Sequence, residues 1–448
     1  MSTKTKLILL IAAALFLASC GREETTRETA ERLSREFIAE LRAENYARAW
    51  EQGTIGFRAD ISIRQLENMW IEILMEAGSF EAVRGVEAGL YGSGYITLVR
   101  TEHRNRLVVW ELIYETGQDG GLSLSAAEAL VLYRPARFGP LPAGVIEESV
   151  VIGEKSEFPL NGRLTLPAHI EGPLPAVVLV HDQGAWDMDA SVFDNKPFRD
   201  IAHYLARRGI AVLRYDSVLY AHPQELERLY GNRLTANRTT VYAAAAARAL
   251  LYGDERIDQS RVYVLGHGFG GTMAALICAR YGYSGWISLA GTPRSPLERA
   301  IDARLFAADR EGRGPGYQEA LRITIEAAAV LYRELGNNYR AAELTLLDIP
   351  GYFLQNLINN PPSHYMSYDF PVLVLQGKNN FEVFFDRDFE LFKLFLLENE
   401  NATFRIYENL NHLFMQSTME FPNLRDYRPY ASVDSAVLTD IAEWINSR

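Results

Sequence analysis

The stretch that decides the fold is Gly266-His267-Gly268-Phe269-Gly270-Gly271. It follows the apolar run 262–265 and leads directly into a second apolar run, 272–280, whose pattern suits a helix. Four glycines within six residues permit a tight turn in which strand and helix backbones approach closely. We therefore predict a strand, a sharp turn and a helix over residues 262–280.

The segments around this turn repeat the alternation of strand and helix. Runs of buried strand separated by helices are typical of a parallel, doubly wound α/β sheet. Asn161-Gly162, between two short runs, predicts the turn of a β-hairpin ahead of that sheet. Strands are expected at 176–180, 211–214, 286–289, 371–375 and 403–407, and helices at 197–208, 241–251 and 435–445.

An insertion interrupts this alternation at about residues 292–369. Its pattern is mostly helical, and it carries the aromatic residues Tyr352, Phe353, Tyr365 and Tyr368. Because it follows a core strand, we expect it to cap the carboxyl ends of the strands, where α/β sheets bind ligands. A packing layer remote from any site is the alternative.

A smaller α+β domain is predicted ahead of the sheet, over residues 27–134. Helical patterns cover 25–44 and 62–77, and strand-like stretches cover 81–90, 95–100 and 107–114. The proline-rich segment 134–142 cannot sustain a helix or a central strand, so it marks the domain boundary. The second domain is then expected at 146–448.

The first twenty residues have the composition of a targeting segment. Lys4 and Lys6 precede the apolar run 7–17, which is short for a membrane span, and Leu17-Ala18-Ser19-Cys20 follows. This pattern resembles the lipobox of bacterial lipoproteins. The resemblance implies a signal peptide at 1–19, lipidation of Cys20, a tether at 20–26 and a lipid-anchored place in the bacterial cell envelope. A plain secretory signal is the alternative.

The charge of the chain bears on its partners. A net charge of −12 argues against nucleic acid, because that binding needs a basic surface. No spacing of histidine, cysteine and carboxylate residues indicates a metal site, and we expect no cofactor. The spacing Gly266-x-Gly268-x-x-Gly271 does fit a dinucleotide-binding turn, but the next strand, 286–289, lacks the acid that would hold a ribose.

Several ordered motifs resemble one family. The turn at 266–271 is similar to the nucleophile elbow, G-x-S-x-G. His181-Asp182-Gln183-Gly184 is similar to an oxyanion loop, Gln376-Gly377 to the start of the loop that holds an acid, and Asn411-His412-Leu413-Phe414 to a histidine loop. On these residues the chain resembles the α/β-hydrolase superfamily, in particular its bacterial esterase and serine-aminopeptidase-like branch with a fused N-terminal domain.

The departures from that family fall on its catalytic positions. Gly268 stands where the nucleophilic serine belongs, and Asn380 stands at the acid position. Of the triad, His412 alone remains, at the base position. Asp182 replaces an oxyanion-loop glycine, beside the two backbone donors that the resemblance implies, Gln183 and Phe269. The Asp182 carboxylate either opposes developing negative charge in the site or points to solvent.

These residues leave three functions open. The first is a pseudoenzyme whose capped pocket binds a small acyl, ester or peptide-like ligand at the cell envelope. The second is a weak or non-standard hydrolase in which His412, paired with Asp216 or Glu382, activates water. The third is a structural lipoprotein. Neither Thr272 nor Cys278 suits the nucleophile's role, because both lie along the helix that leaves the site.

Overall fold

The computed structural model describes residues 21–448, apart from 119, 133–139, 170, 311–313, 335–344, 348, 418 and 420–421. The expected signal peptide and Cys20 therefore lie outside the described residues. The chain divides into two compact units: residues 1–139 with 191–195 and 427–430, and the remainder. Among the described residues, none of the helices has the length and apolar character needed to cross a membrane.

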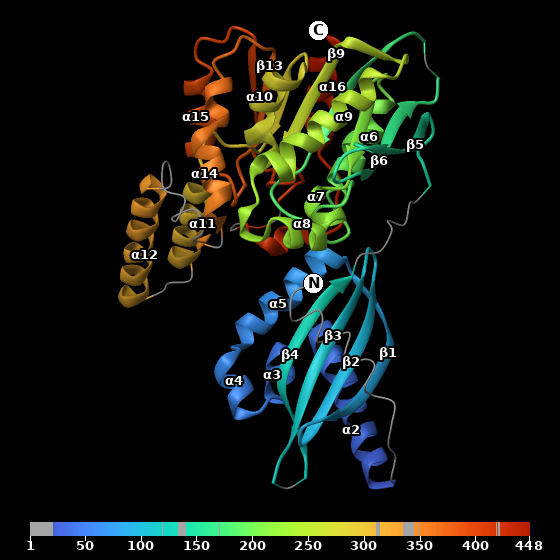
Figure 1. The fold of residues 1–448 in the computed structure, drawn as a ribbon, viewed down its shortest axis with the longest axis vertical. Coiled ribbons are helices and arrows are strands. Elements are labelled where there is room, and N and C mark those ends of the chain that lie inside the picture. Colours follow the sequence, from blue (N-terminus) through green and yellow to red (C-terminus); the bar gives the residue numbers. More distant parts are fainter. Residues whose placement is uncertain are drawn as a thin grey trace. The chain divides into compact units, whose positions relative to one another are not determined.

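The larger unit is built on an eight-stranded sheet in the order β14-β13-β10-β9-β7-β8-β6-β5 (Figure 1). Its central strands are parallel, and β6 and β5 run antiparallel at one edge. The predicted doubly wound sheet is confirmed. The strands are β5 (Val145–Ile152), β6 (Leu160–Pro167), β7 (Leu174–Val180), β8 (Ala211–Tyr215), β9 (Ile257–His267), β10 (Trp286–Leu289), β13 (Val372–Gly377) and β14 (Ala402–Tyr407).

Two pairs of helices pack on this sheet. Helix α9 (Tyr242–Tyr252) contacts α10 (Phe269–Tyr281), while α16 (Ser435–Asn446) contacts α6 (Pro197–Ala206). Strand β7 is buried along its whole length and β9 is buried over residues 262–267, since both are covered on both sides there. Shorter helices α7 (Val218–Ala221), α8 (Pro223–Leu229) and α15 (Glu390–Phe395) lie in the connections.

The β-hairpin at β5 and β6 exists, but its predicted turn is wrong. Asn161 and Gly162 lie inside β6, and the connection runs from Gly153, at φ +60°, to Pro159. A glycine is needed at 162 for a different reason: a Cβ there would stand 2.7 Å from the Arg214 carbonyl oxygen of the adjacent strand β8. Close strand packing, and not a turn, accounts for this glycine.

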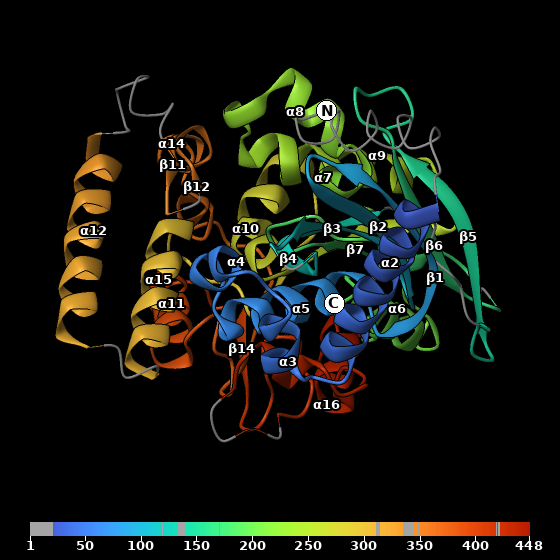
Figure 2. The ribbon, with the colours of Figure 1, turned by 90° about the horizontal axis from the view of Figure 1, so that it is seen from below.

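The insertion forms helices α11 (Pro296–Arg310), α12 (Pro315–Glu334) and α14 (Gly351–Asn359), with the short strands β11 (Thr345–Leu346) and β12 (Ile349–Pro350). Helices α11 and α12 lie side by side in both views (Figures 1 and 2). Helix α14 is amphipathic and buries Phe353, Leu354 and Leu357. These three residues of α14 pack into the core of this unit, together with Leu297 of α11 and Ala328 of α12.

The smaller unit contains a four-stranded antiparallel sheet, β1 (Phe80–Tyr91), β2 (Gly94–His103), β3 (Leu107–Thr116) and β4 (Leu122–Leu132). Sequence analysis missed β4. The helices are α2 (Gly21–Arg42), which begins before the predicted residue 25, α3 (Tyr46–Glu51), α4 (Ile55–Asp60) and α5 (Ile63–Ala77). Helix α5 starts with a capping box at Ser62. The buried aromatic core of the smaller unit is formed by Phe37, Trp70 and Trp110.

Candidate active site

The turn between β9 and α10 is the sharp one that the sequence predicts. Gly268 adopts φ +53° and ψ −115°, a conformation that strains any residue with a side chain. Its N–H donates to the Leu289 carbonyl oxygen at 2.9 Å. A Cβ on Gly266 would meet Gly270 backbone atoms at 2.1 Å, and one on Gly270 would meet the Val180 oxygen at 2.3 Å. These glycines are explained by packing within the turn, so they provide no argument for a nucleotide.

The space beside Gly268 is filled by another residue. An ideal Cβ on Gly268 would lie 2.2 Å from Cγ and 2.2 Å from Oδ2 of Asp182. Asp182 comes from the loop after β7, so its carboxylate reaches the turn from a neighbouring strand. It stands where the side chain of a residue at 268 would begin. Asp182 therefore points into the site and not to solvent.

The Asp182 carboxylate also accepts hydrogen bonds from the two backbone N–H groups expected to bind an oxyanion. Its Oδ1 accepts hydrogen bonds from Phe269 N at 2.6 Å and from Gln183 N at 2.7 Å. These are the two N–H groups that the resemblance assigns to binding a substrate's developing oxyanion. An oxygen of the protein itself now occupies that position.

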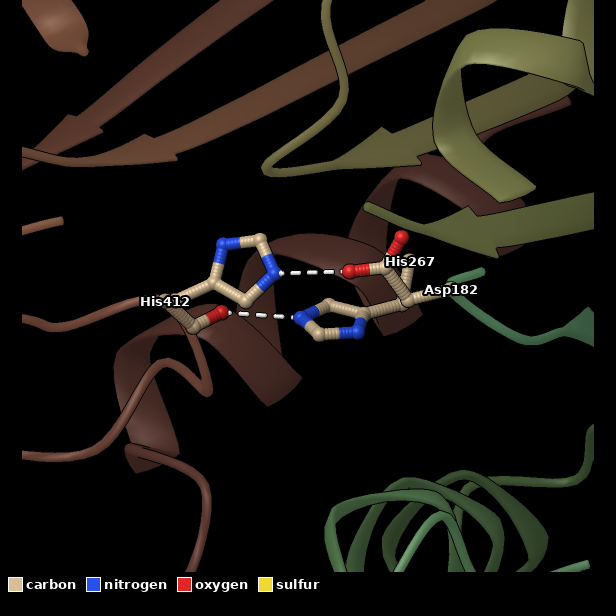
Figure 3. Close-up of side chains that lie close together, drawn as sticks. All are labelled: Asp182, His267 and His412. Atoms are coloured by element: carbon tan, nitrogen blue, oxygen red, sulfur yellow. Dashed lines mark hydrogen bonds and ion pairs between the residues drawn. The ribbon is translucent and has the colours of Figure 1, made fainter. Parts of the chain in front are cut away.

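His412 connects this carboxylate with Asn380 (Figure 3 shows its Nε2 directed at Asp182). The Nε2 atom lies 3.2 Å from Asp182 Oδ2, and Nδ1 lies 3.0 Å from Asn380 Nδ2. Asn380 Oδ1 accepts from the backbone N–H groups of Glu382 and Val383, at 2.9 and 3.0 Å. The amide NH₂ must therefore face His412, and Nδ1 must be the acceptor. His412 is then neutral and carries its proton on Nε2.

Comparison with known proteins identifies the family of the chain. Residues 177–421 match the Alpha/beta hydrolase family. This chain belongs to that family. It is 27% identical over 415 residues to Esterase EstD of Thermotoga maritima, covering 91% of this chain and 93% of that protein.

Two solved structures of hydrolases can be superposed on the chain. An esterase of Pyrococcus furiosus is 12% identical, with a TM-score of 0.40, over 70% of this chain and 96% of the other. A puromycin-hydrolysing peptidase of Mycobacterium tuberculosis is 15% identical, with a TM-score of 0.44, over 83% of this chain and 53% of the other.

In this α/β hydrolase the hydrogen bonds of the catalytic positions run in the reverse direction. In a serine triad the serine O–H donates to histidine Nε2, and histidine Nδ1–H donates to the acid. Here Asn380 donates to Nδ1, and Nε2–H donates to Asp182. No lone pair of the His412 ring is left to accept a proton from a nucleophile or a water.

The charges around Asp182 keep it ionised. Burial alone would raise the pKa of its carboxyl, but the hydrogen bond from His412 and the positive charge of Arg299 hold that pKa below its ordinary value. Arg299 Nη1, from α11, lies 3.8 Å from Oδ1. Burial lowers the pKa of His267 to about 4, so this ring is neutral at pH 7. The carboxylate is the one anionic group among these four side chains.

Asp182, His267 and His412 also lie close enough together to raise the question of a metal ion. Their candidate ligand atoms lie within 4.8 Å of one another. A histidine ligand needs a free lone pair, and its other nitrogen should donate to an acceptor. His412 does not meet this requirement, because its Nε2 carries a proton and its Nδ1 faces an amide donor. His267 does meet it, since its Nε2 donates to the His412 carbonyl oxygen at 2.9 Å and leaves Nδ1 free. With His412 excluded, the three residues do not provide the three ligands of a metal site.

An apolar cavity of about 190 Å³ opens beside this site. Asp182 and Gln183 of the oxyanion loop form one wall, and Phe353 of α14 closes it from the insertion. The insertion thus contributes to a cap over the loops that follow β7 and β8. The remaining lining residues are Val180, His181, Gly184, Tyr215, Ser217, Leu219, Leu234, Thr239, Thr240, Ala243 and Pro350.

The other candidates from the sequence make different interactions. Asp216 Oδ1 accepts from Met188 N at 2.9 Å, and the carboxylate hydrogen-bonded to His412 is that of Asp182. Thr272 donates to the Gly268 carbonyl oxygen, and burial raises the pKa of the Cys278 thiol to about 12. Sequence analysis missed Arg299, which no motif marks because it lies in the insertion. It also gave no role to His267, although this residue lies within the turn.

Proposed function

We propose that this chain is a non-catalytic α/β hydrolase whose capped cavity binds a small molecule. One observation carries the proposal: the Asp182 carboxylate occupies both the place of a side chain at 268 and the two N–H groups meant for an oxyanion. A substrate carbonyl would have to displace a buried anion from its hydrogen bonds. Gly268 has no hydroxyl to attack it, and Ser217, which lines the cavity, donates its hydroxyl to the Gly184 carbonyl oxygen at 3.3 Å.

The hydrogen bonds of His412 do not favour the alternative function, a hydrolase in which this ring activates water. To take a proton at Nε2, the ring would need its hydrogen on Nδ1, facing the NH₂ of Asn380. An exchange of aspartate for asparagine at this position costs about ten-thousandfold in the serine-protease example. In this chain the Asp182 carboxylate further stabilises the unreactive tautomer.

The cavity favours binding over a purely structural role. A wall that includes Phe353 of the insertion encloses an apolar space next to an ionised carboxylate, which is a combination typical of small-molecule sites. The similarity to Esterase EstD over 91% of the chain supports a pocket inherited from an ester-cleaving ancestor. In a protein with a purely structural role we would expect this space to be filled by side chains, because an empty cavity lowers the free energy of unfolding.

The experiment compares the wild type with Asp182→Gly/Gly268→Ser/Asn380→Asp on short-chain p-nitrophenyl esters. The triple variant empties the oxyanion position, supplies the nucleophile and restores the acid. We expect hydrolysis from the triple variant, abolished by adding His412→Ala, and none from the wild type above the His412→Ala background. Wild-type hydrolysis that needs Asp182 and His412 would overturn the non-catalytic assignment.

We further propose that the protein is a lipoprotein of the bacterial cell envelope, anchored through Cys20. The basic residues, short apolar run and Leu-Ala-Ser-Cys sequence at 17–20 support this. Metabolic labelling with a palmitate analogue should mark the wild type and not Cys20→Ser, and the labelled protein should sediment with membranes. A soluble, unlabelled wild-type protein would contradict the anchor.

A further inference from the structure

We propose that the ligand of the cavity presents a hydrogen-bond-donating head, an ammonium or a hydroxyl group, to Asp182 and carries a small apolar body. This rests on the proposed binding function and names its ligand class. It replaces the acyl, ester or peptide-like ligand expected from the sequence. The substitution at 182 has inverted the polarity of the site.

The acceptor is the free part of the Asp182 carboxylate. An ionised carboxylate offers about four lone-pair positions. Phe269 N and Gln183 N take Oδ1, and His412 Nε2–H takes one position on Oδ2. The Arg299 guanidinium, at 3.8 Å from Oδ1, is beyond hydrogen-bond distance. One acceptor position on Oδ2 is therefore left for a donor, while a ligand carbonyl or carboxylate would meet oxygen against oxygen.

A second polar group faces the same cavity. Tyr215, at the end of β8, is only 2% exposed, lines the cavity, and its hydroxyl has no hydrogen-bond partner among the described residues. Burial raises the pKa of this hydroxyl, so it remains protonated. Tyr215 provides a second, weaker hydrogen bond.

The size of the cavity limits the apolar body. At about 190 Å³ it is smaller than the 300–1,000 Å³ or so of pockets for drug-sized ligands. A cavity of roughly 150 Å³ is known to hold benzene in another protein. Phe353, Leu219 and Leu234 supply apolar walls for such a ring. A single aromatic ring with a one-carbon arm fits both the volume and the walls.

Three probes of the same shape test the head group: benzylamine, benzyl alcohol and benzoate. Their binding to the purified soluble chain is measured by calorimetry at pH 7. We expect benzylamine to bind at least about tenfold more tightly than benzoate, because its ammonium donates a charge-assisted hydrogen bond to Asp182, whereas benzoate has only acceptors and the same charge as Asp182. Benzyl alcohol should fall between them. An order in which benzoate binds best, or in which the three bind equally, would overturn the proposal.

Two variants locate the contact. Asp182→Asn has the same shape and can keep Oδ1 on the two N–H groups, but its NH₂ replaces the whole of Oδ2, both the free acceptor position and the acceptor of His412 Nε2–H. It should lose at least about tenfold in benzylamine affinity. Tyr215→Phe should lose a few-fold for the alcohol. Thermal melts of both variants establish that they fold, and unchanged benzylamine binding in a folded Asp182→Asn chain would refute the assignment.

The outcome also separates this inference from the proposed function. Tight binding of benzoate alone leaves a binding protein with a different ligand class. If none of the three probes binds, and intact-protein mass spectrometry under native conditions finds no ligand in the wild type, both the ligand class and the binding function are wrong. The esterase assay of the triple variant is independent of either result.

Discussion

The turn at Gly268 and the loop at Asn380 both differ from the serine-triad pattern, but in different physical ways. At the turn, Gly268 has no side chain, and the carboxylate of Asp182, from the loop after β7, occupies the space that a side chain at 268 would fill. At the loop, one carboxylate oxygen has become an NH₂ group in the same place, with Oδ1 still on the Glu382 and Val383 N–H groups. The first change is one of shape and the second is one of hydrogen-bond direction.

This difference shows which change is the harder to reverse. Asn380 can return to aspartate without moving any neighbouring atom. Gly268 cannot return to serine while Asp182 keeps its position, because the two side chains would need the same space. The reversal of hydrogen bonds also joins the two places through His412, whose tautomer suits both Asn380 and Asp182. Each change stabilises the other.

The largest effect expected is on catalysis at the loop. In the Asp182→Gly/Gly268→Ser background, adding Asn380→Asp should raise kcat for p-nitrophenyl acetate by up to about ten-thousandfold, because an acid at 380 accepts Nδ1–H and frees Nε2 as a base. Steady-state kinetics of the double and triple variants measure it. Glu382→Gln, two residues further along the loop, serves as a control that removes a charge and leaves residue 380, which faces His412 Nδ1, unchanged. Equal rates with and without Asn380→Asp would refute the tautomer argument.

The next largest effect is on stability at the turn. Gly268→Ser alone should lower the free energy of unfolding by about 4 kcal/mol, because its Cβ would expel the Asp182 carboxylate from its hydrogen bonds. Urea unfolding measures this. Gly282→Ser is the matched control: Gly282 has φ +67° with nothing within 4 Å of an added Cβ, so this substitution adds only backbone strain of about 1 kcal/mol.

A double-mutant cycle sharpens that result. In the Asp182→Gly chain, Gly268→Ser should cost clearly less than it does in the wild type, because the space is empty and only the backbone strain at 268 remains. A penalty that persists without Asp182 would mean that strain at 268, and not the collision, determines it. The hypothesis that Asp182 and a side chain at 268 compete for the same space would then be wrong.

The regular part of the fold was accessible from sequence because its signals are local. Strands such as β10 (Trp286–Leu289) are short apolar runs between helical patterns, and this periodicity is enough to place them. The hairpin turn was misplaced because Gly162 satisfies two requirements that one sequence cannot distinguish, a turn or a close approach of strands. Strand β4 carries no clean alternation of buried and exposed residues, and it was missed.

Only some features of the candidate site could be predicted from the sequence. Glycine at 268 and asparagine at 380 follow from ordered motifs, and the presence of a carboxylate at 182 follows from the same motifs. The direction of the Asp182 side chain does not, because rotamers are set by neighbours that are distant in sequence. The orientation of the Asn380 amide likewise depends on two backbone N–H groups folded around it. Arg299 arrives from an insertion with no motif to mark it.

The smallest effect expected is on the pH dependence of the free energy of unfolding, and it arises at His267. Because burial lowers its folded pKa to about 4 from an ordinary 6.5, the unfolded chain takes up a proton near pH 6.5 and the folded chain does not until about pH 4. The unfolded state therefore binds more protons between these values, and the free energy of unfolding must fall as the pH falls from 7 to 4. The loss at this residue is on the order of 3 kcal/mol.

Replacing His267 with glutamine isolates this contribution. Glutamine can donate to the His412 carbonyl oxygen as His267 Nε2 does, but it does not titrate. Urea midpoints from pH 7 to 4 should fall less steeply for His267→Gln than for the wild type, even though His181, also held at a pKa of about 4 by burial, still contributes. Identical slopes would mean that His267 accepts its proton in the folded chain, placing a second positive charge beside Asp182 and weakening the case for an ammonium ligand there.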